Sequence, residues 1–310
     1  MATEFDALVP ADMAAKAETI GIKKAGMDLL TMFALSILAG AFIAMGAIFS
    51  TTSVAGMAGV TPYGIIRLVA GLTFTLGLIL VVVAGAELFT GNNLIAMAWA
   101  GGKVSTGALL RNWVVVYAGN FVGSIATAYL MFLGRQYTFG GGAIGITALN
   151  TANAKTGYDF MQAFVLGIFC NALVCLAVWL CFSARSTTDK IMSIIPPIAA
   201  FVAAGFEHSI ANMYFIPVGL FIQTDSAWLA SLGDKAPKLA NLTWSNFFIN
   251  NLIPVTLGNI VGGALMGVIG VVAVVPLAAI ARDVFIYVYN RLTEEAHSSD
   301  ALPPHGHIPE

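Results

Sequence analysis

The chain has 310 residues, of which 58% are hydrophobic and 10% are charged. Soluble domains carry about 25% charged residues, so this composition excludes a soluble globular protein and indicates an integral membrane protein. The formal net charge is −2 at pH 7. In a membrane protein the position of basic residues matters more than their sum, and nothing in the sequence suggests a nucleic-acid partner.

Residues 10–26 predict a short amphipathic helix. Asp12 lies near its start and Lys23 and Lys24 near its end, which is the charge order that a helix dipole favours. Such a helix would lie on the inner membrane surface or over a pore mouth, and a simple interfacial anchor is an equally good interpretation. No basic region precedes an apolar core here, so we do not expect a cleavable signal peptide. We assign residues 1–28 to a cytoplasmic amphipathic segment.

Six membrane spans are predicted after this segment, because about 20 apolar residues cross the hydrocarbon core of a bilayer. The spans cover about residues 29–49, 63–100, 112–133, 160–182, 191–222 and 247–281. The second and fifth are too long for one straight helix and are predicted to be broken. The fifth starts with Pro196 and Pro197, while Pro254 and the pair Gly258 and Asn259 are candidate breaks in the sixth.

The remaining segments are assigned as loops and a tail. A Gly-rich external loop ends near Lys155, and a second external loop covers residues 223–245. Residues 29–285 form the predicted channel domain, and residues 286–310 form a cytoplasmic polar tail. No metal or cofactor is expected, since the cysteines share the fourth span, where they read as apolar packing residues. These cysteines are Cys170, Cys175 and Cys181.

The breaks in the second and fifth spans share the spacing G-x-E-x-x-x-x-N, over residues 85–92 and 205–212. Each break places a carboxylate at membrane depth, where an ionisable group is a functional candidate by default. The matched positions equally favour a structural role, in which the carboxylates satisfy backbone groups that the breaks set free. The candidate structural residues are Glu87, Asn92, Glu207 and Asn212.

His208 has no counterpart in the first break, where Leu88 occupies the equivalent position. It is the one histidine of the sequence at membrane depth, and an imidazole can carry a charge or a proton near physiological pH. A hydrogen-bonded packing role is the alternative. Thr90 could supply a hydroxyl to the same cavity from the other break.

The third and sixth spans also match each other, because the pattern N-x6-G-N-x-x-G begins at Asn112 and again at Asn251. Two paired motifs in the same order predict a duplicated three-span unit. Three crossings is an odd number, so the second copy enters the membrane with opposite orientation and forms an inverted three-plus-three repeat. The first and fourth spans show no comparable match. In folds of this kind the helix breaks mark the solute pathway near the midplane.

The basic residues predict the orientation, since nine lysines and arginines fall on one side of the predicted membrane and five on the other. By the positive-inside rule the side with nine is cytoplasmic, and both termini lie on that side. The nine are Lys16, Lys23, Lys24, Lys103, Arg111, Arg185, Lys190, Arg282 and Arg291.

Four long stretches resemble the signature segments of the formate/nitrite transporter family. They read GAELFTGN, NWVVVYAGNFVGS, PPIAAFVAAGFEHSIANMYFIPVGL and NLIPVTLGNIVGGALMG. The likeness runs from about residue 15 to residue 285, and within the family it is greatest to the formate-channel branch. The resemblance implies an all-α polytopic protein of the bacterial inner membrane. It also implies a homopentamer in which each protomer has its own aquaporin-like, six-span pore.

The resemblance also implies roles for matched positions. Thr90 and His208 would lie at the centre of the pore, and Lys155 would attract anions at the outer vestibule. The implied outer constriction is Phe74 with Phe201, and the inner one is Leu78 with Leu88. The further residues implied near the pathway are Phe89, in the loop of the first break, and Asn171, Val174 and Asn259.

These roles lead to a hypothesis for transport. Hydrophobic constrictions oppose a bare anion, because removing its water costs on the order of several kcal/mol. Lys155 and the half-helix ends would concentrate formate, and His208, assisted by Thr90, would lend it a proton so that it crosses as neutral formic acid. A protonated His208 that stabilises the anion is the alternative. In the family the N-terminal segment is linked to pH-dependent gating.

Other functions are compared with this one. A nitrite or hydrosulfide channel of the same family remains an alternative, and an aquaporin-like channel for neutral solutes is disfavoured because paired Asn-Pro-Ala motifs are absent from the sequence. An enzyme is not expected, since no multi-histidine cluster or nucleophile-and-base set occurs at depth. The expected partners are formate, other small monovalent anions, protons, membrane lipid and further copies of the chain.

Overall fold

The computed structural model describes residues 7–269 and Tyr287, and the regular elements of this part are all helices. Within it, five helices are long and apolar enough to cross a membrane, and a bent pair of helices makes up to six. The protein is therefore an all-helical polytopic membrane protein, consistent with six predicted spans. The end of the sixth span at 270–281, the tail from 288 onward, and Arg282 and Arg291 lie outside the described residues.

The spans begin where a polar side chain caps a helix. Asp28, Ser105 and Asp159 each accept a hydrogen bond from a backbone N–H in the first turn of the following helix. The capped helices are α2 (Leu29–Val54), α6 (Thr106–Leu133) and α8 (Phe160–Ser183). The third span begins at Thr106, after its cap at Ser105, which is six residues before its predicted start. The prediction was late because the first turns of α6 are less apolar than its centre.

The two overlong spans are broken, as predicted. The second consists of α3 (Tyr63–Ala84), α4 (Phe89–Asn92) and α5 (Ile95–Ala100). The fifth consists of α9 (Thr187–Ala204) and α10 (Ser209–Ile222), which are bent by 52° at the break. Pro196 and Pro197 lie inside α9 and not at its start, because Ser186 and Asp189 form a capping box that begins the helix earlier.

Two loop predictions and one break prediction are wrong in part. The residues before Lys155 form a helix, α7 (Ala143–Lys155), and the second external loop contains α11 (Ser226–Ser231) and α12 (Trp244–Asn246). In the sixth span, α13 (Ile253–Ile269) continues through the predicted break at Gly258 and Asn259. The irregularity lies earlier, in the π-helical segment η3 (Phe247–Leu252). This segment precedes Pro254, and proline has no backbone N–H to donate to the preceding turn.

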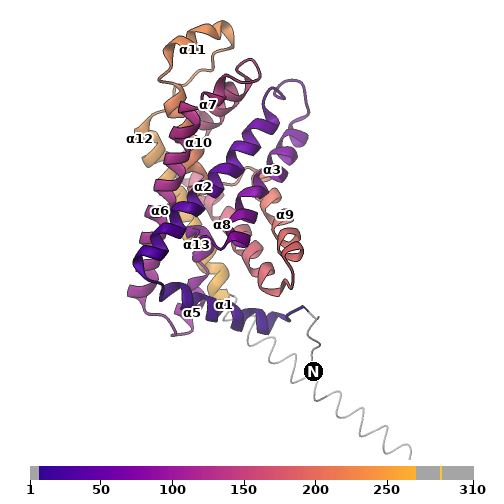
Figure 1. Ribbon diagram of the computed structural model, residues 1–310, viewed down its shortest axis with the longest axis vertical. Helices are drawn as coiled ribbons and strands as arrows, with labels where there is room; N and C mark the ends of the chain where they lie inside the picture. Colours follow the sequence, from indigo (N-terminus) through magenta and orange to yellow (C-terminus); the bar gives the residue numbers. More distant parts are fainter. Residues whose placement is uncertain (1–6, 270–286, 288–310) are drawn as a thin grey trace, which may run out of the picture.

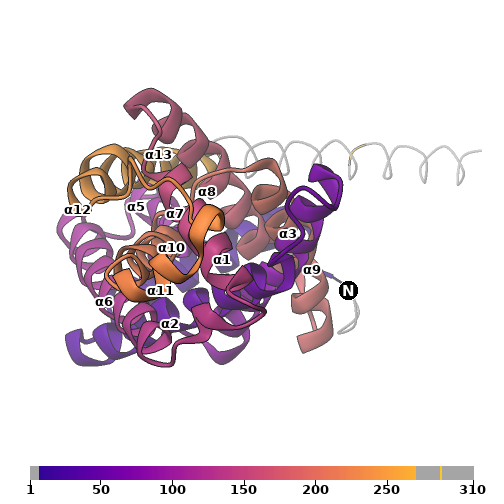
Figure 2. The same cartoon turned by 90° about the horizontal axis from the view of Figure 1, so that it is seen from above.

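The long helices run roughly side by side, with α7 and α11 at one end of the bundle and α1 (Pro10–Ala25) and α5 at the other (Figure 1). Helix α2 packs against α3 and α6, and α8 packs in the same way against α9 and α13. Contact between α3 and α9 joins the two sets, and α10 lies against α2, α6 and α7 within the bundle (Figure 2). This matched packing is consistent with the predicted duplicated unit.

Glycines of the repeated motif allow these helices to approach closely. A Cβ atom on Gly123 would overlap the carbonyl oxygen of Ile37 in α2, and one on Gly262 would overlap that of Ile168 in α8. Backbone atoms cannot turn aside as a side chain can, so only glycine fits at either position. Gly258, which the sequence offered as a possible break in α13, is likewise a contact point between helices, because a Cβ there would overlap the carbonyl oxygen of Phe164 in α8.

We expect Gly262→Ala to destabilise the protein, because the new methyl group must push α13 away from α8. Overpacking of this kind costs about 1–3 kcal/mol. Gly107→Ala is the matched control, because a Cβ there meets nothing within 4 Å and alanine favours a helix. Thermal unfolding of the two purified variants in detergent measures the difference. Equal melting temperatures would contradict this account of the packing.

Candidate functional site

The two helix breaks have the same backbone geometry. Gly85 ends α3 with φ of 78°, and Gly205 ends α9 with φ of 80°. This left-handed conformation is open to glycine at little cost, so the glycine of each motif reverses the chain out of its helix. A short extended stretch follows, and a new helix begins at Phe89 or Ser209.

Each break holds a carboxylate that forms a buried ion pair. The Nζ atom of Lys24 lies 2.6 Å from Oε1 of Glu87, and that of Lys155 lies 2.7 Å from Oε1 of Glu207. The glutamate side chains are 5% and 2% exposed. Both break carboxylates are therefore buried, and each is paired with a lysine from a short helix outside the spans.

Asparagines of the repeat motifs extend each ion pair into a network. The amide of Asn92 donates to Glu87 and to Asn112 (2.7 and 2.9 Å), and the amide of Asn212 donates to Glu207 and to Asn251 (2.7 and 2.7 Å). Asn112 and Asn251 in turn donate to the carbonyl oxygens of the paired lysines, at 3.0 and 2.9 Å. The same contacts therefore occur once in each half of the molecule.

A second pair of asparagines fixes the backbone of the breaks. Asn120 and Asn259 donate to the carbonyl oxygens of the break glutamates, at 2.9 and 3.0 Å. Each also accepts from the first backbone N–H of the next helix, that of Phe89 or Ser209, at 2.9 Å in both cases. Backbone groups that a broken helix leaves free at membrane depth are thus satisfied by side chains.

These networks support the structural role for the glutamates and for Asn92 and Asn212. They also pair α1 with α7, because Lys24 and Lys155 end these two helices and make equivalent contacts. The sequence did not reveal this correspondence, since the offset between the two copies changes from motif to motif. The N-terminal helix is thus packed into the same network as the spans.

His208 and Thr90 come together from the two breaks. Thr90 Oγ1 lies 2.8 Å from His208 Nε2, and the side chains are fully or almost fully buried. The backbone N–H of Ala211 donates to His208 Nδ1 at 3.0 Å. Because Nδ1 accepts this bond, the imidazole is neutral and carries its proton on Nε2, which donates to the Thr90 hydroxyl.

The aromatic and aliphatic residues predicted to form constrictions are all buried. The rings of Phe74 and Phe201 are 5.7 Å apart, and the Phe201 ring is 5.9 Å from the imidazole of His208. Leu78 and Leu88 are also buried and line a cavity of about 360 Å³ that extends to α1. A buried polar pair with apolar constrictions beside it is typical of a selective pathway for a small solute, and the constriction roles of these four residues remain predictions.

Three other residues predicted near the pathway make contacts with the protein interior. Asn171 donates to Asn93 and to the carbonyl oxygen of Asn259, both at 2.7 Å. Phe89 packs against Tyr117 of α6, with ring centroids 4.9 Å apart. Val174 is buried in the apolar core. Their roles in a pathway remain predictions.

Lys155 makes more contacts within the protein than a lysine that only attracts anions from solution would need. Besides its ion pair with Glu207, its ammonium lies 5.6 Å from the centroid of the Phe215 ring, and its side chain is 16% exposed. Its role at an outer vestibule remains a prediction. Arg67, one of the five basic residues on the predicted outer side, was not predicted as a site residue. Its guanidinium donates to the carbonyl oxygens of Val202 and Ala203 and so caps the end of α9.

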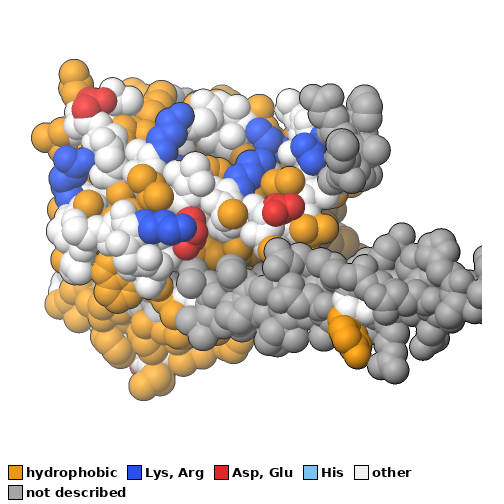
Figure 3. Space-filling model, turned by 90° about the horizontal axis from the view of Figure 1, so that it is seen from below, with side chains coloured by type: hydrophobic (Ala, Val, Ile, Leu, Met, Phe, Trp, Pro, Cys, Tyr) orange, Lys and Arg blue, Asp and Glu red, His pale blue; other side chains and the backbone are white. Residues whose placement is uncertain are grey.

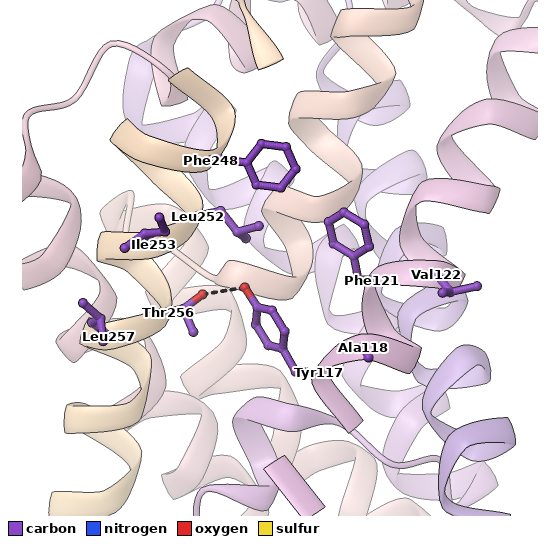
Figure 4. Close-up of a pocket in the computed structure, with 9 residues that line it drawn as sticks. All are labelled: Tyr117, Ala118, Phe121, Val122, Phe248, Leu252, Ile253, Thr256 and Leu257. Atoms are coloured by element: carbon purple, nitrogen blue, oxygen red, sulfur yellow. Dashed lines mark hydrogen bonds between the residues drawn. The ribbon is translucent and has the colours of Figure 1, made fainter. Parts of the chain in front are cut away.

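A larger cavity, of about 580 Å³, lies apart from the breaks (Figure 4). Its walls come from α6 and from the η3 and α13 region and are almost wholly apolar. Its two hydroxyl groups, those of Tyr117 and Thr256, bond to each other at 2.8 Å. No charged residue is found among the described residues that line this cavity, so the breaks remain the predicted location of the pathway.

The bundle, the two breaks and the buried polar pair between them define a polytopic membrane protein with a solute pathway. The sequence model described as "Formate/nitrite transporter" matches residues 11–274. The chain belongs to the formate/nitrite transporter family, which confirms the resemblance noted from its motifs.

Similar proteins support this membership. The formate channel FocA of Escherichia coli K12 is 46% identical over 265 residues, which cover 84% of this chain and 92% of the relative. FocA of Haemophilus influenzae is 44% identical over 262 residues, with the same coverage. A solved pentameric formate channel with formate bound is 48% identical, with a TM-score of 0.73, over 76% of this chain and 93% of that one.

Proposed function

We propose that this protein is a channel that passes formate and related small monovalent anions across the bacterial inner membrane. The contact between Thr90 and His208 carries the proposal, because it joins the two helix breaks through a buried pair that can bear a proton, next to the apolar residues predicted to form constrictions. The similar proteins named as formate channels support formate over nitrite or hydrosulfide as the main solute. Transport is the only activity we assign, with no enzymatic reaction.

The geometry defines what the proton hypothesis requires. An imidazolium carries N–H groups on both nitrogens, so a protonated His208 could no longer accept from Ala211. Lending a proton to formate and stabilising the anion as imidazolium both need this protonated form. We infer that the helix cap at Nδ1 keeps the resting side chain neutral, and that the cap opens when the side chain takes up a proton.

The proposed assembly is a homopentamer in which each protomer has its own pathway, in line with the pentameric relative. Both termini are assigned to the cytoplasm. The face that carries α1 displays many lysine and arginine side chains (Figure 3), as the positive-inside rule expects. We divide the chain into residues 1–28, 29–285 and 286–310 and assign pH-dependent gating to the first segment.

Flux measurements with proteoliposomes test this proposal. We expect rapid uptake of formate, slower uptake of nitrite and hydrosulfide, and a dependence of formate flux on pH between acidic and neutral values. Empty vesicles of the same lipid give the background. Nitrite or hydrosulfide flux well above formate flux would contradict the substrate assignment, and flux that does not vary with pH would contradict gating.

A further inference from the structure

The cavity between α1 and the first break has a strongly basic lining. It has a volume of about 360 Å³, and its lining includes Leu78 and Leu88, the predicted inner constriction. Its lysines come from two helices, with Lys16, Lys23 and Lys24 on α1 and Lys190 on α9. Glu87 is the one carboxylate among the described residues that line it.

The charges in this cavity do not balance. Lys24 is paired with Glu87, and the ammonium of Lys16 donates to the neutral carbonyl oxygen of Phe182 at 2.7 Å. The ammonium groups of Lys23 and Lys190 make no hydrogen bond or ion pair with any described residue. Among the described residues that line the cavity, three positive charges therefore lack a neutralising carboxylate in a partly enclosed space.

Such a cavity favours anions of higher charge. A cleft lined by one sign of charge within low-dielectric walls raises the local concentration of opposite charges, and the attraction grows with the charge of the anion. The cost of removing water grows still faster with charge, so a polyvalent anion that the cavity attracts cannot follow formate past Leu78 and Leu88. The cavity would hold such an anion at the mouth of the pathway.

We propose that this cavity is a binding site for free polyvalent oxyanions, of the phosphate and pyrophosphate class, which block the pathway from the α1 side. The anion would lie among the ammonium groups of Lys16, Lys23 and Lys190. The blocking effect rests on the proposed function, whereas binding does not. The site differs from the Thr90–His208 pair, since neither residue of that pair lines this cavity.

Binding is tested first, in detergent without added lipid. Pyrophosphate should raise the melting temperature of the native protein more than sodium chloride of equal ionic strength does. Replacing Lys23 or Lys190 with glutamine should raise the pyrophosphate concentration needed for half of this effect about two- to fivefold, and the double replacement about tenfold. Lys235→Gln, on the opposite end of the molecule, is the charge-matched control and should behave like the native protein.

Blocking is tested in vesicles of neutral lipid, with formate flux normalised for each variant. Pyrophosphate should inhibit from one side of the membrane only, and the double variant should resist it. Absence of both stabilisation and inhibition would overturn the proposal. Stabilisation by vesicles of phosphatidylglycerol, with none by free pyrophosphate, would also overturn it, because the cavity would then bind lipid headgroups. If formate flux itself is absent, the proposed function fails while the melting experiment still decides whether the anion binds.

Discussion

Replacing His208 with asparagine is expected to abolish proton movement during formate transport while leaving the fold intact. Asparagine is a good helix cap, and its side-chain oxygen can accept from the Ala211 N–H as His208 Nδ1 does. The amide does not titrate, so the variant loses the proton carrier and keeps the cap. If formate crosses as the neutral acid, flux at acidic pH should fall about tenfold or more, since positioned proton transfer typically contributes at least that much.

The measurement uses proteoliposomes with a pH-sensitive dye inside and compares the native protein with the variant. Thr90→Ser is the control at the partner position, because it keeps the hydroxyl that faces His208 Nε2. We expect that control to retain a proton signal. A native-like proton signal in His208→Asn would make His208 a capping and packing residue. Selectivity would then reside in the constrictions and the half-helix dipoles.

Replacing Glu207 with glutamine is expected to cause a large loss of stability. Glutamine keeps an oxygen for Asn212 but leaves the ammonium of Lys155 without its counter-charge, in a site where the lysine is 16% exposed. Removing one partner of a buried ion pair costs about 3–5 kcal/mol. Adding Lys155→Met to this variant should restore much of the stability, because no charge then stays buried.

The first break supplies a matched control within the same molecule. Glu87→Gln makes the same chemical change, but Lys24 is 27% exposed and can turn its ammonium toward water. We therefore expect a smaller loss of stability from Glu87→Gln than from Glu207→Gln. Melting temperatures of the purified variants decide the order. Equal losses would show that burial of the lysine does not set the cost.

The helix breaks could be predicted from the sequence because their chemistry is local. A glycine, a carboxylate and an asparagine at fixed spacing interrupt an apolar run, and the structure places Gly85 and Gly205 in the left-handed conformation. The contact between Thr90 and His208 also follows from two breaks that meet. The geometry of this contact could not be predicted, because the tautomer of His208 depends on the hydrogen bond from Ala211 and on the angle at which α10 leaves the break.

The parts that sequence reasoning missed depend on packing between distant segments. The residues of α7 carry too little periodic signal to be distinguished from a loop, and the ion pair that holds the end of this helix joins Lys155 to the distant Glu207. Gly258 looks like a break in isolation, but a Cβ there would overlap the carbonyl oxygen of Phe164 in α8. A glycine that allows close approach and one that ends a helix are alike in sequence.

Concurrent measurement of formate and proton movement through the native protein, in vesicles at acidic pH, tests the central claim most directly. We expect formate and protons to cross in equal amounts, because each formate takes up a proton at the Thr90–His208 pair before it passes an apolar constriction. Formate flux that sets up a membrane potential and carries no protons would contradict it.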